Sequence, residues 1–200
     1  MGGDLAALYQ YPPSRSADED ESIHLGIMPS ASSEIDRQSY IESVGRTVGV
    51  LRSRTGRHVR VTVLALNNHP DFGDDALALS LTVSLRGLGC GVNTVRYVEL
   101  GIAETIEIIA GMDFALPTRL HGALVSYFCD TPFAFLEHQD KCSNFSIDIG
   151  LPSVLRLNPA SKAEAWVSAV QAMLDGAKPT MSPLTYRKRA EKAYVGDCCG

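Results

Sequence analysis

The sequence predicts a single α/β domain built on a doubly wound parallel sheet. Two observations predict this class. Short apolar segments rich in β-branched residues alternate with longer segments in which apolar residues recur at helical spacing. Apolar residues also make up 45% of the 200 residues, which is enough to fill one ordinary core. We therefore expect strands and helices to follow one another in βαβ units.

The first half of the expected domain contains two strands and two helices. An apolar stretch at 23–28 predicts the first strand, and residues 34–54 predict a helix. Four apolar residues share one stripe of that helix: Ile41, Val44, Val48 and Leu51. Residues 59–66 (VRVTVLAL) predict the second strand because β-branched residues dominate them. A second amphipathic helix is expected at 74–88, ending at a glycine.

The second half repeats this alternation of strands and helices, with shorter elements. The strands are expected at 93–98, 113–116, 132–136 and 154–157. The helices are expected at 102–110, 118–128 and 161–174. No helix is expected between 136 and 154.

The chain divides into three parts by composition. Residues 1–22 form a leading segment, with a short helical stretch at 4–8 and a proline-rich, acidic linker after it. Residues 23–177 form the α/β domain. Residues 178–200 form a tail with a basic helix at 186–194, which either packs on another domain or is a solvated end.

Charge and cysteine usage exclude several functions. The net charge of −5, without a basic stripe, argues against nucleic-acid binding. No apolar run reaches the length of a membrane helix, and the N-terminus lacks a secretory pattern, so we expect a cytoplasmic protein. The five cysteines, including the terminal pair Cys198 and Cys199, lack CxxC spacing. We therefore expect reduced thiols and no metal site.

The most informative segment is DFALPTRLHG at 113–122. In an open parallel sheet, ligands bind beyond the carboxyl ends of the strands, and here a strand runs into a helix start at Thr118. Backbone N–H groups at a helix start attract anions, and Arg119 adds a planar, bidentate donor. His121, two residues on, supplies a titratable imidazole. A bare R-x-H triplet also fits a surface ion pair and a histidine bonded to a backbone carbonyl.

Other polar residues follow the remaining strands. His69 and Asp71 come after the second strand and fit either a site or a turn. Glu137 follows the fifth strand, and Lys141 lies a little beyond it. The chain has no GxGxxG, GxxxxGK[ST] or GxSxG motif, so the usual phosphate cradles and the serine-nucleophile elbow are not expected.

The stretch 104–152 resembles the C-terminal part of the polysaccharide pyruvyl transferase family. The match lies in the string DFALPTRLHGALVSYFCDTPFAF, followed by Lys141, Phe145 and the sequence DIGL from Asp148. In that family a helix leads to an Asp, a short strand and an R-[LF]-H on the next helix. A Pro-led apolar strand, a lysine and a D-x-G-L-like end follow. The match from Ile23 to Asp74 is looser, with the same βαβα order.

The resemblance implies a Rossmann-like lobe of a glycosyltransferase-B-like architecture. Such enzymes move pyruvate from phosphoenolpyruvate onto sugar hydroxyls as a ketal, here in an exopolysaccharide, cell-wall or capsule polymer, without a cofactor. Arg119, with Thr118, would bind the anionic donor, and His121 would be the acid-base residue or a further anion contact. His69, Lys141 and Glu137 would be further substrate contacts.

The family has two lobes, and 200 residues hold only one. We therefore expect a partial chain that folds, binds phosphoenolpyruvate weakly and transfers negligible pyruvate alone. An exposed apolar patch would face a missing N-terminal lobe and favour self-association. Two alternatives remain open: the donor lobe of a nucleotide-sugar glycosyltransferase, with Glu137 on the ribose, and a non-catalytic binding domain.

Overall fold

The computed structural model describes residues 11–12 and 22–196. The short helix expected at 4–8 and the cysteine pair 198–199 lie outside these residues. Where the structure describes the chain, strands and helices alternate in the predicted order.

The sheet is parallel, and its strand order reverses once. Its four strands are β1 (Ser22–Met28), β2 (His58–Ala65), β3 (Gly91–Arg96) and β4 (Phe114–Pro117), in the spatial order β3-β2-β1-β4. The register sets Ile27 beside Val63 on one side and Leu116 on the other. The chain therefore builds outward from β1 to β3 and then crosses back to β4.

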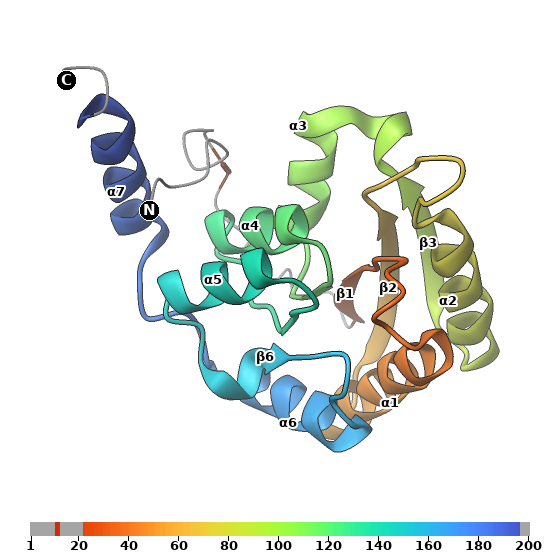
Figure 1. Ribbon diagram of the computed structural model, residues 1–200. Helices are drawn as coiled ribbons and strands as arrows, with labels where there is room; N and C mark the ends of the chain where they lie inside the picture. Colours follow the sequence, from red (N-terminus) through yellow and green to blue (C-terminus); the bar gives the residue numbers. More distant parts are fainter. Residues whose placement is uncertain (1–10, 13–21, 197–200) are drawn as a thin grey trace.

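That reversal places helices on both faces of the sheet. The first helices are α1 (Arg37–Thr55), α2 (Asp75–Gly87), α3 (Tyr97–Ala110) and α4 (Leu120–Phe128). Right-handed crossovers put α1 and α2 on one face, and the reversed crossover puts α3 on the other, beside α4 (Figure 1). The predicted doubly wound parallel sheet is confirmed.

The core lies between the sheet and its helices. Leu25, Ile27 and Val63 are completely buried, as expected for strands covered on both faces. The stripe predicted on α1 faces the sheet through Val44 and Leu51, which are also completely buried. Burying side chains of this size stabilises the fold by roughly 1.5–3 kcal/mol each.

Beyond β4 the elements are shorter than predicted. The two-residue strands β5 (Phe135–Leu136) and β6 (Arg156–Leu157) pair in parallel, and one bridge between Ala115 and Phe133 connects them to the main sheet. A 3-10 helix, η2 (Ser153–Leu155), occupies the first half of the strand expected at 154–157. The last domain helix is α6 (Ala163–Leu174), which packs against α1.

The structure contains one helix that was not predicted, α5 (Asp140–Asp148). Its sequence DKCSNFSID is mostly polar, and only Cys142, Phe145 and Ser146 are buried. Three buried positions within two turns are too few to give a recognisable apolar period, so the helix depends on tertiary packing.

The basic tail forms helix α7 (Pro183–Gly196), which packs on the domain. Tyr186 is buried among aromatic rings, with centroids 5.8 Å from Tyr127, 5.9 Å from Phe128 and 6.1 Å from Phe145. Edge-to-face pairs of this kind are favourable. The tail is therefore not a solvated end, and it packs on the α/β domain of this chain itself, not on another domain.

The thiols in the described residues are buried and unpaired. Cys90, Cys129 and Cys142 are free cysteines, and burial raises the pKa of Cys129 to about 12. A thiol with such a pKa is scarcely nucleophilic at neutral pH. Within the described chain, no helix combines the length and apolarity needed to cross a membrane.

Candidate functional site at the carboxyl ends of the strands

One buried carboxylate joins the loops that follow three strands. Asp74, just before α2, is completely buried. It accepts backbone hydrogen bonds from Ala31, after β1, at 3.0 Å and from Asn67, after β2, at 3.1 Å. It also pairs with Arg119, after β4. The loops singled out from the sequence therefore meet at one rim of the sheet.

The pair between Arg119 and Asp74 is bidentate. Arg119 donates from Nε to Oδ2 at 2.5 Å and from Nη2 to Oδ1 at 2.6 Å. The side chain of Arg119 is 27% exposed, whereas the side chain of Asp74 is completely buried. Of the two alternatives for Arg119, an ion pair and an anion contact, the ion pair is present. It leaves Nη1 unused by Asp74.

Arg119 and His121 line a single cavity of about 550 Å³ between α3 and α4. Asn67 and Thr105 are two further polar residues in the lining of this cavity. Apolar and aromatic side chains form the rest of the wall: Tyr11, Leu66, Tyr97, Ile102, Ile106, Ile109 and Val125. The cavity lies beyond the carboxyl ends of β2, β3 and β4, the edge at which open α/β sheets bind ligands. It combines a positive end with an extended apolar wall.

Gly122 explains why α4 begins so close to the strand ends. A Cβ on Gly122 would lie 2.7 Å from Sδ of Met28, at the end of β1. A larger residue would require Met28, Leu66 and Pro117 or α4 itself to shift. The glycine of the R-L-H-G sequence is thus required by a close approach.

A kink in α3 shapes the opposite wall of the cavity. Gly101 has φ of 78°, a left-handed conformation that glycine adopts without strain. It separates the first turn, which contains Tyr97, from the rest of the helix. Tyr97 and Ile102, on either side of the kink, both face the cavity.

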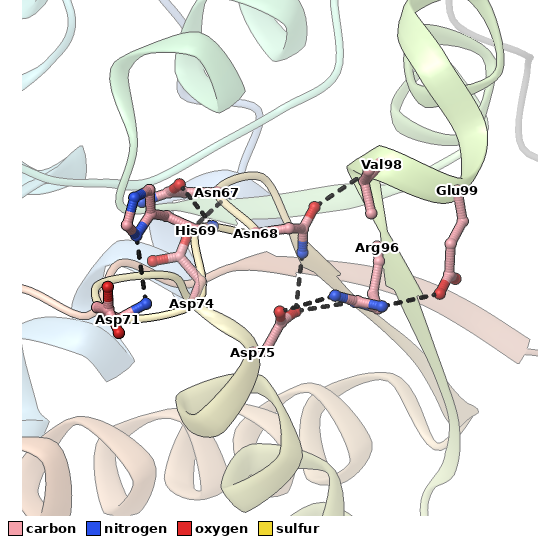
Figure 2. A network of polar contacts seen from close by, with 9 residues as sticks. All are labelled: Asn67, Asn68, His69, Asp71, Asp74, Asp75, Arg96, Val98 and Glu99. Carbon is pink, nitrogen blue, oxygen red and sulfur yellow. Dashed lines mark hydrogen bonds and ion pairs between the residues drawn. The ribbon is translucent and has the colours of Figure 1, made fainter.

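Two neighbouring aspartates hold the arginines at the ends of two strands. While Asp74 binds Arg119, the next residue, Asp75, binds Arg96 at the end of β3 at 3.1 and 3.2 Å. Asn68 links Asp75 to α3: it donates to Asp75 at 2.8 Å and accepts the N–H of Val98 at 3.1 Å (Figure 2). This network fixes the first turn of α3 at the rim.

Two of the predicted substrate contacts lie at the rim but outside the cavity. Thr118 is buried, and its hydroxyl lies 3.3 Å from that of Tyr40, beneath the surface. His69 is exposed in the loop after β2, where its ring stacks on Phe72 and its Nδ1 accepts the N–H of Asp71 (Figure 2). The helix start expected at Thr118 falls two residues later, at Leu120.

Glu137 and Lys141 also lie outside the cavity. Glu137 is almost buried and accepts two bonds from Arg156, at 2.7 and 3.0 Å. Burial alone would raise the pKa of Glu137, but the hydrogen bonds and charge of Arg156, together with smaller contributions from the hydroxyls of Ser146 and Ser143, outweigh it and hold the pKa below its ordinary value. Lys141 is exposed in the first turn of α5.

Asp74 and His138 were noted among the polar residues that follow the second and fifth strands, but sequence reasoning gave neither a role. Nothing local reveals that Arg119 binds Asp74 from 45 residues away. His138 is 9% exposed, and its Nδ1 has no hydrogen-bond partner among the described residues. Burial lowers its pKa, and the charges of Arg119 and Lys141 add to this effect.

Two other cavities are not lined by the residues of the candidate site. Cavities of about 880 and 740 Å³ lie over the β1–β3 face and beside the segment before α7, and neither is lined by a predicted site residue. Within the described residues, no group of three or more histidines, cysteines or carboxylates is arranged to hold a metal ion.

Comparisons with known proteins support the fold of this chain, but they do not assign the chain to a family. No protein-family model matches the sequence, and no curated protein matches it. Among solved structures, the UDP-GlcNAc 2-epimerase of Methanocaldococcus jannaschii is similar, with a TM-score of 0.58 and 11% identity over 90% of this chain and 46% of that one.

Two further structures are similar over less than half of their own length. The UDP-forming α,α-trehalose-phosphate synthase of Burkholderia xenovorans has a TM-score of 0.52 and 11% identity over 88% of this chain and 40% of that one. The pneumococcal O-GlcNAc transferase GtfA has the same TM-score and identity over 94% and 36%. The chain thus has the Rossmann-like fold of one lobe of glycosyltransferase-B proteins.

Proposed function

We propose that this chain is the donor-binding lobe of a pyruvyl transferase, which moves pyruvate from phosphoenolpyruvate onto a sugar as a ketal. One observation carries the proposal: Arg119 and His121 line the same cavity, beyond the carboxyl end of β4. These are the two residues that the resemblance to the polysaccharide pyruvyl transferase family singles out. The glycosyltransferase-B-like fold supports a lobe that handles sugar substrates.

Arg119 is suited to bind the anionic end of phosphoenolpyruvate. Asp74 fixes its guanidinium through two bonds, so little side-chain entropy remains to be lost when a ligand binds. The unused Nη1 and the exposed edge can donate to a carboxylate or phosphate oxygen. Asp74 also neutralises most of the arginine's charge, which favours release of inorganic phosphate after transfer.

His121 is suited to deliver the proton that starts the reaction. A proton added to C3 of phosphoenolpyruvate converts its CH₂ group into CH₃ and leaves an oxocarbenium-like centre at C2. A sugar hydroxyl attacks C2 and loses its proton, after which the C2–O bond to phosphate breaks. A second hydroxyl of the same sugar closes the ketal, and its proton leaves with phosphate. An exposed imidazole beside Arg119 can supply the first proton and take up another.

The second lobe would complete the acceptor side. Phe72, Val98 and Ile102 are exposed large apolar side chains in the loop before α2 and at the start of α3. These segments belong to the same rim, so the three side chains are candidates for the apolar patch expected to face another lobe. Water exclusion and orientation by a second lobe contribute strongly to such reactions.

The nucleotide-sugar alternative is less well supported by the contacts. It needs a carboxylate for the donor ribose after the fifth strand, and Glu137 is the residue at that place. Both carboxylate oxygens of Glu137 are already bonded to Arg156. A ribose would have to displace an almost buried, charge-assisted pair.

Ligand competition tests the proposed function. The purified chain is titrated with phosphoenolpyruvate, UDP-glucose and UDP-N-acetylglucosamine, and binding is measured by calorimetry. We expect phosphoenolpyruvate to bind and the nucleotide sugars not to displace it, and His121→Gln to retain binding because Arg119 carries the anion contact. Binding of the nucleotide sugars alone would favour the alternative, and no binding of any ligand would favour a non-catalytic domain.

A further inference from the structure

The proposed donor has almost no apolar surface that could contact the apolar wall of the cavity. Phosphoenolpyruvate carries a carboxylate and a phosphate, and its only apolar part is one CH₂ group. A cavity of about 550 Å³ is large enough to bury a ligand of drug size. The donor therefore occupies the end with Arg119 and His121 and leaves the remaining volume, between α3 and α4, for a second ligand.

The lining of that remaining volume is mostly apolar. Ile102, Ile106, Ile109 and Val125 present aliphatic groups, and Tyr97 adds a ring. The nearby hydroxyl of Thr105 donates to the carbonyl of Gly101 at 2.6 Å, so its proton is committed within the helix. A hydroxyl buried against this wall would lose its hydrogen bonds to water and gain few in return. A methyl group buried there would gain free energy.

We propose that the apolar end of the cavity is an acceptor subsite selective for a hexopyranose that carries a methyl group. This inference rests on the proposed function, because it takes the donor to lie at Arg119. Tyr97 would cover the C–H face of the sugar ring, and the aliphatic side chains would enclose the methyl group. That group comes from one of two sources: a 6-deoxy carbon, which replaces a hydroxymethyl group, or an acetamido group, which replaces a hydroxyl.

Matched sugars measure the selectivity directly. Glucose is compared with 6-deoxyglucose and with N-acetylglucosamine, and galactose with 6-deoxygalactose and N-acetylgalactosamine. Dissociation constants are measured by NMR titration of the chain with phosphoenolpyruvate present and absent. Burying one methyl group corresponds to about a three- to fivefold gain in affinity. We expect at least one methyl-bearing sugar to bind at least threefold more tightly than its parent, and the sugar that does so identifies the source of the methyl group.

Two substitutions locate the preference on the cavity wall. Ile102 is 57% exposed and lines the cavity, whereas Val98 is 65% exposed on the same helix and does not. Because both side chains are exposed, Ile102→Asn and Val98→Asn should fold. We expect Ile102→Asn to abolish the preference for the methyl-bearing sugar and Val98→Asn to preserve it.

The outcomes separate this inference from the proposed function. Equal affinities within every set of sugars, or a preference that Ile102→Asn leaves intact, would overturn the acceptor subsite. A chain that does not bind phosphoenolpyruvate yet prefers methyl-bearing sugars would refute the proposed donor and retain a sugar subsite. A chain that binds phosphoenolpyruvate without any such preference would retain the donor site alone.

Discussion

Arg119 and Asp74 form a bidentate ion pair whose carboxylate is completely buried and whose guanidinium reaches the surface of a cavity. The pair connects the loop after β4 to the start of α2. Through its backbone contacts with Ala31 and Asn67, Asp74 also holds the loops after β1 and β2. One side chain thus determines the shape of the rim at which we place the donor.

Removing the charge of Asp74 is expected to destabilise the fold strongly. Breaking one partner of a buried pair typically costs about 3–5 kcal/mol, so Asp74→Asn should lower the free energy of unfolding by about that amount in urea denaturation. Asp75→Asn is the matched control, because Asp75 and Arg96 are 40% and 45% exposed. An exposed pair contributes at most about 1 kcal/mol. Equal losses in the two variants would contradict a special role for Asp74.

The sequence predicted the alternating α/β pattern because that pattern is local. Buried strands such as 59–66 contain β-branched runs, and helices such as 34–54 repeat apolar residues at helical spacing. It did not predict α5, because only three positions of this helix are buried and its few apolar residues show no helical period. β5 and β6 are shorter than their apolar segments, since their pairing depends on neighbours distant in the sequence.

The candidate site was predictable only in part, for a similar reason. Arg119 and His121 stand out because two residue types suited to anions and protons lie two positions apart at a helix start. The partner of Arg119 comes from another loop, and the choice of partner depends on the sheet order β3-β2-β1-β4. The same holds for Glu137, whose partner Arg156 is set by the pairing of β5 with β6.

Acid is expected to weaken the fold through Glu137. The folded state holds the pKa of Glu137 below its ordinary value of 4.5, so the folded state binds fewer protons than the unfolded state. The stabilisation is present above pH 4.5 and is lost as the pH falls through the lower folded pKa. Urea denaturation between pH 6 and 3 should show this loss, and Glu137→Gln should reduce the pH dependence in that window. An unchanged slope in Glu137→Gln would contradict the assignment.

The aromatic contact of the tail should matter for stability and not for the site. Tyr186 packs among Tyr127, Phe128 and Phe145, away from the cavity. Truncating a buried aromatic side chain typically costs about 3–5 kcal/mol, so Tyr186→Ala should lower the free energy of unfolding by about that amount. Tyr186→Phe is the control and should lose much less. A Tyr186→Ala variant of wild-type stability would show that α7 is not held by this cluster.

Binding of phosphoenolpyruvate to Arg119 variants, measured by calorimetry, tests the proposed function most directly. Arg119→Lys keeps the positive charge but lacks the planar fork that binds Asp74 and the ligand together. We expect Arg119→Lys and Arg119→Ala to weaken binding at least tenfold, which matches the loss of about 2–5 kcal/mol typical of a buried, hydrogen-bonded charge. Arg96→Lys, which alters only the exposed pairs of Arg96 with Asp75 and Glu99, should leave the affinity unchanged. Wild-type affinity in a folded Arg119→Lys variant would contradict the account, because it would show that Arg119 serves only as the partner of Asp74.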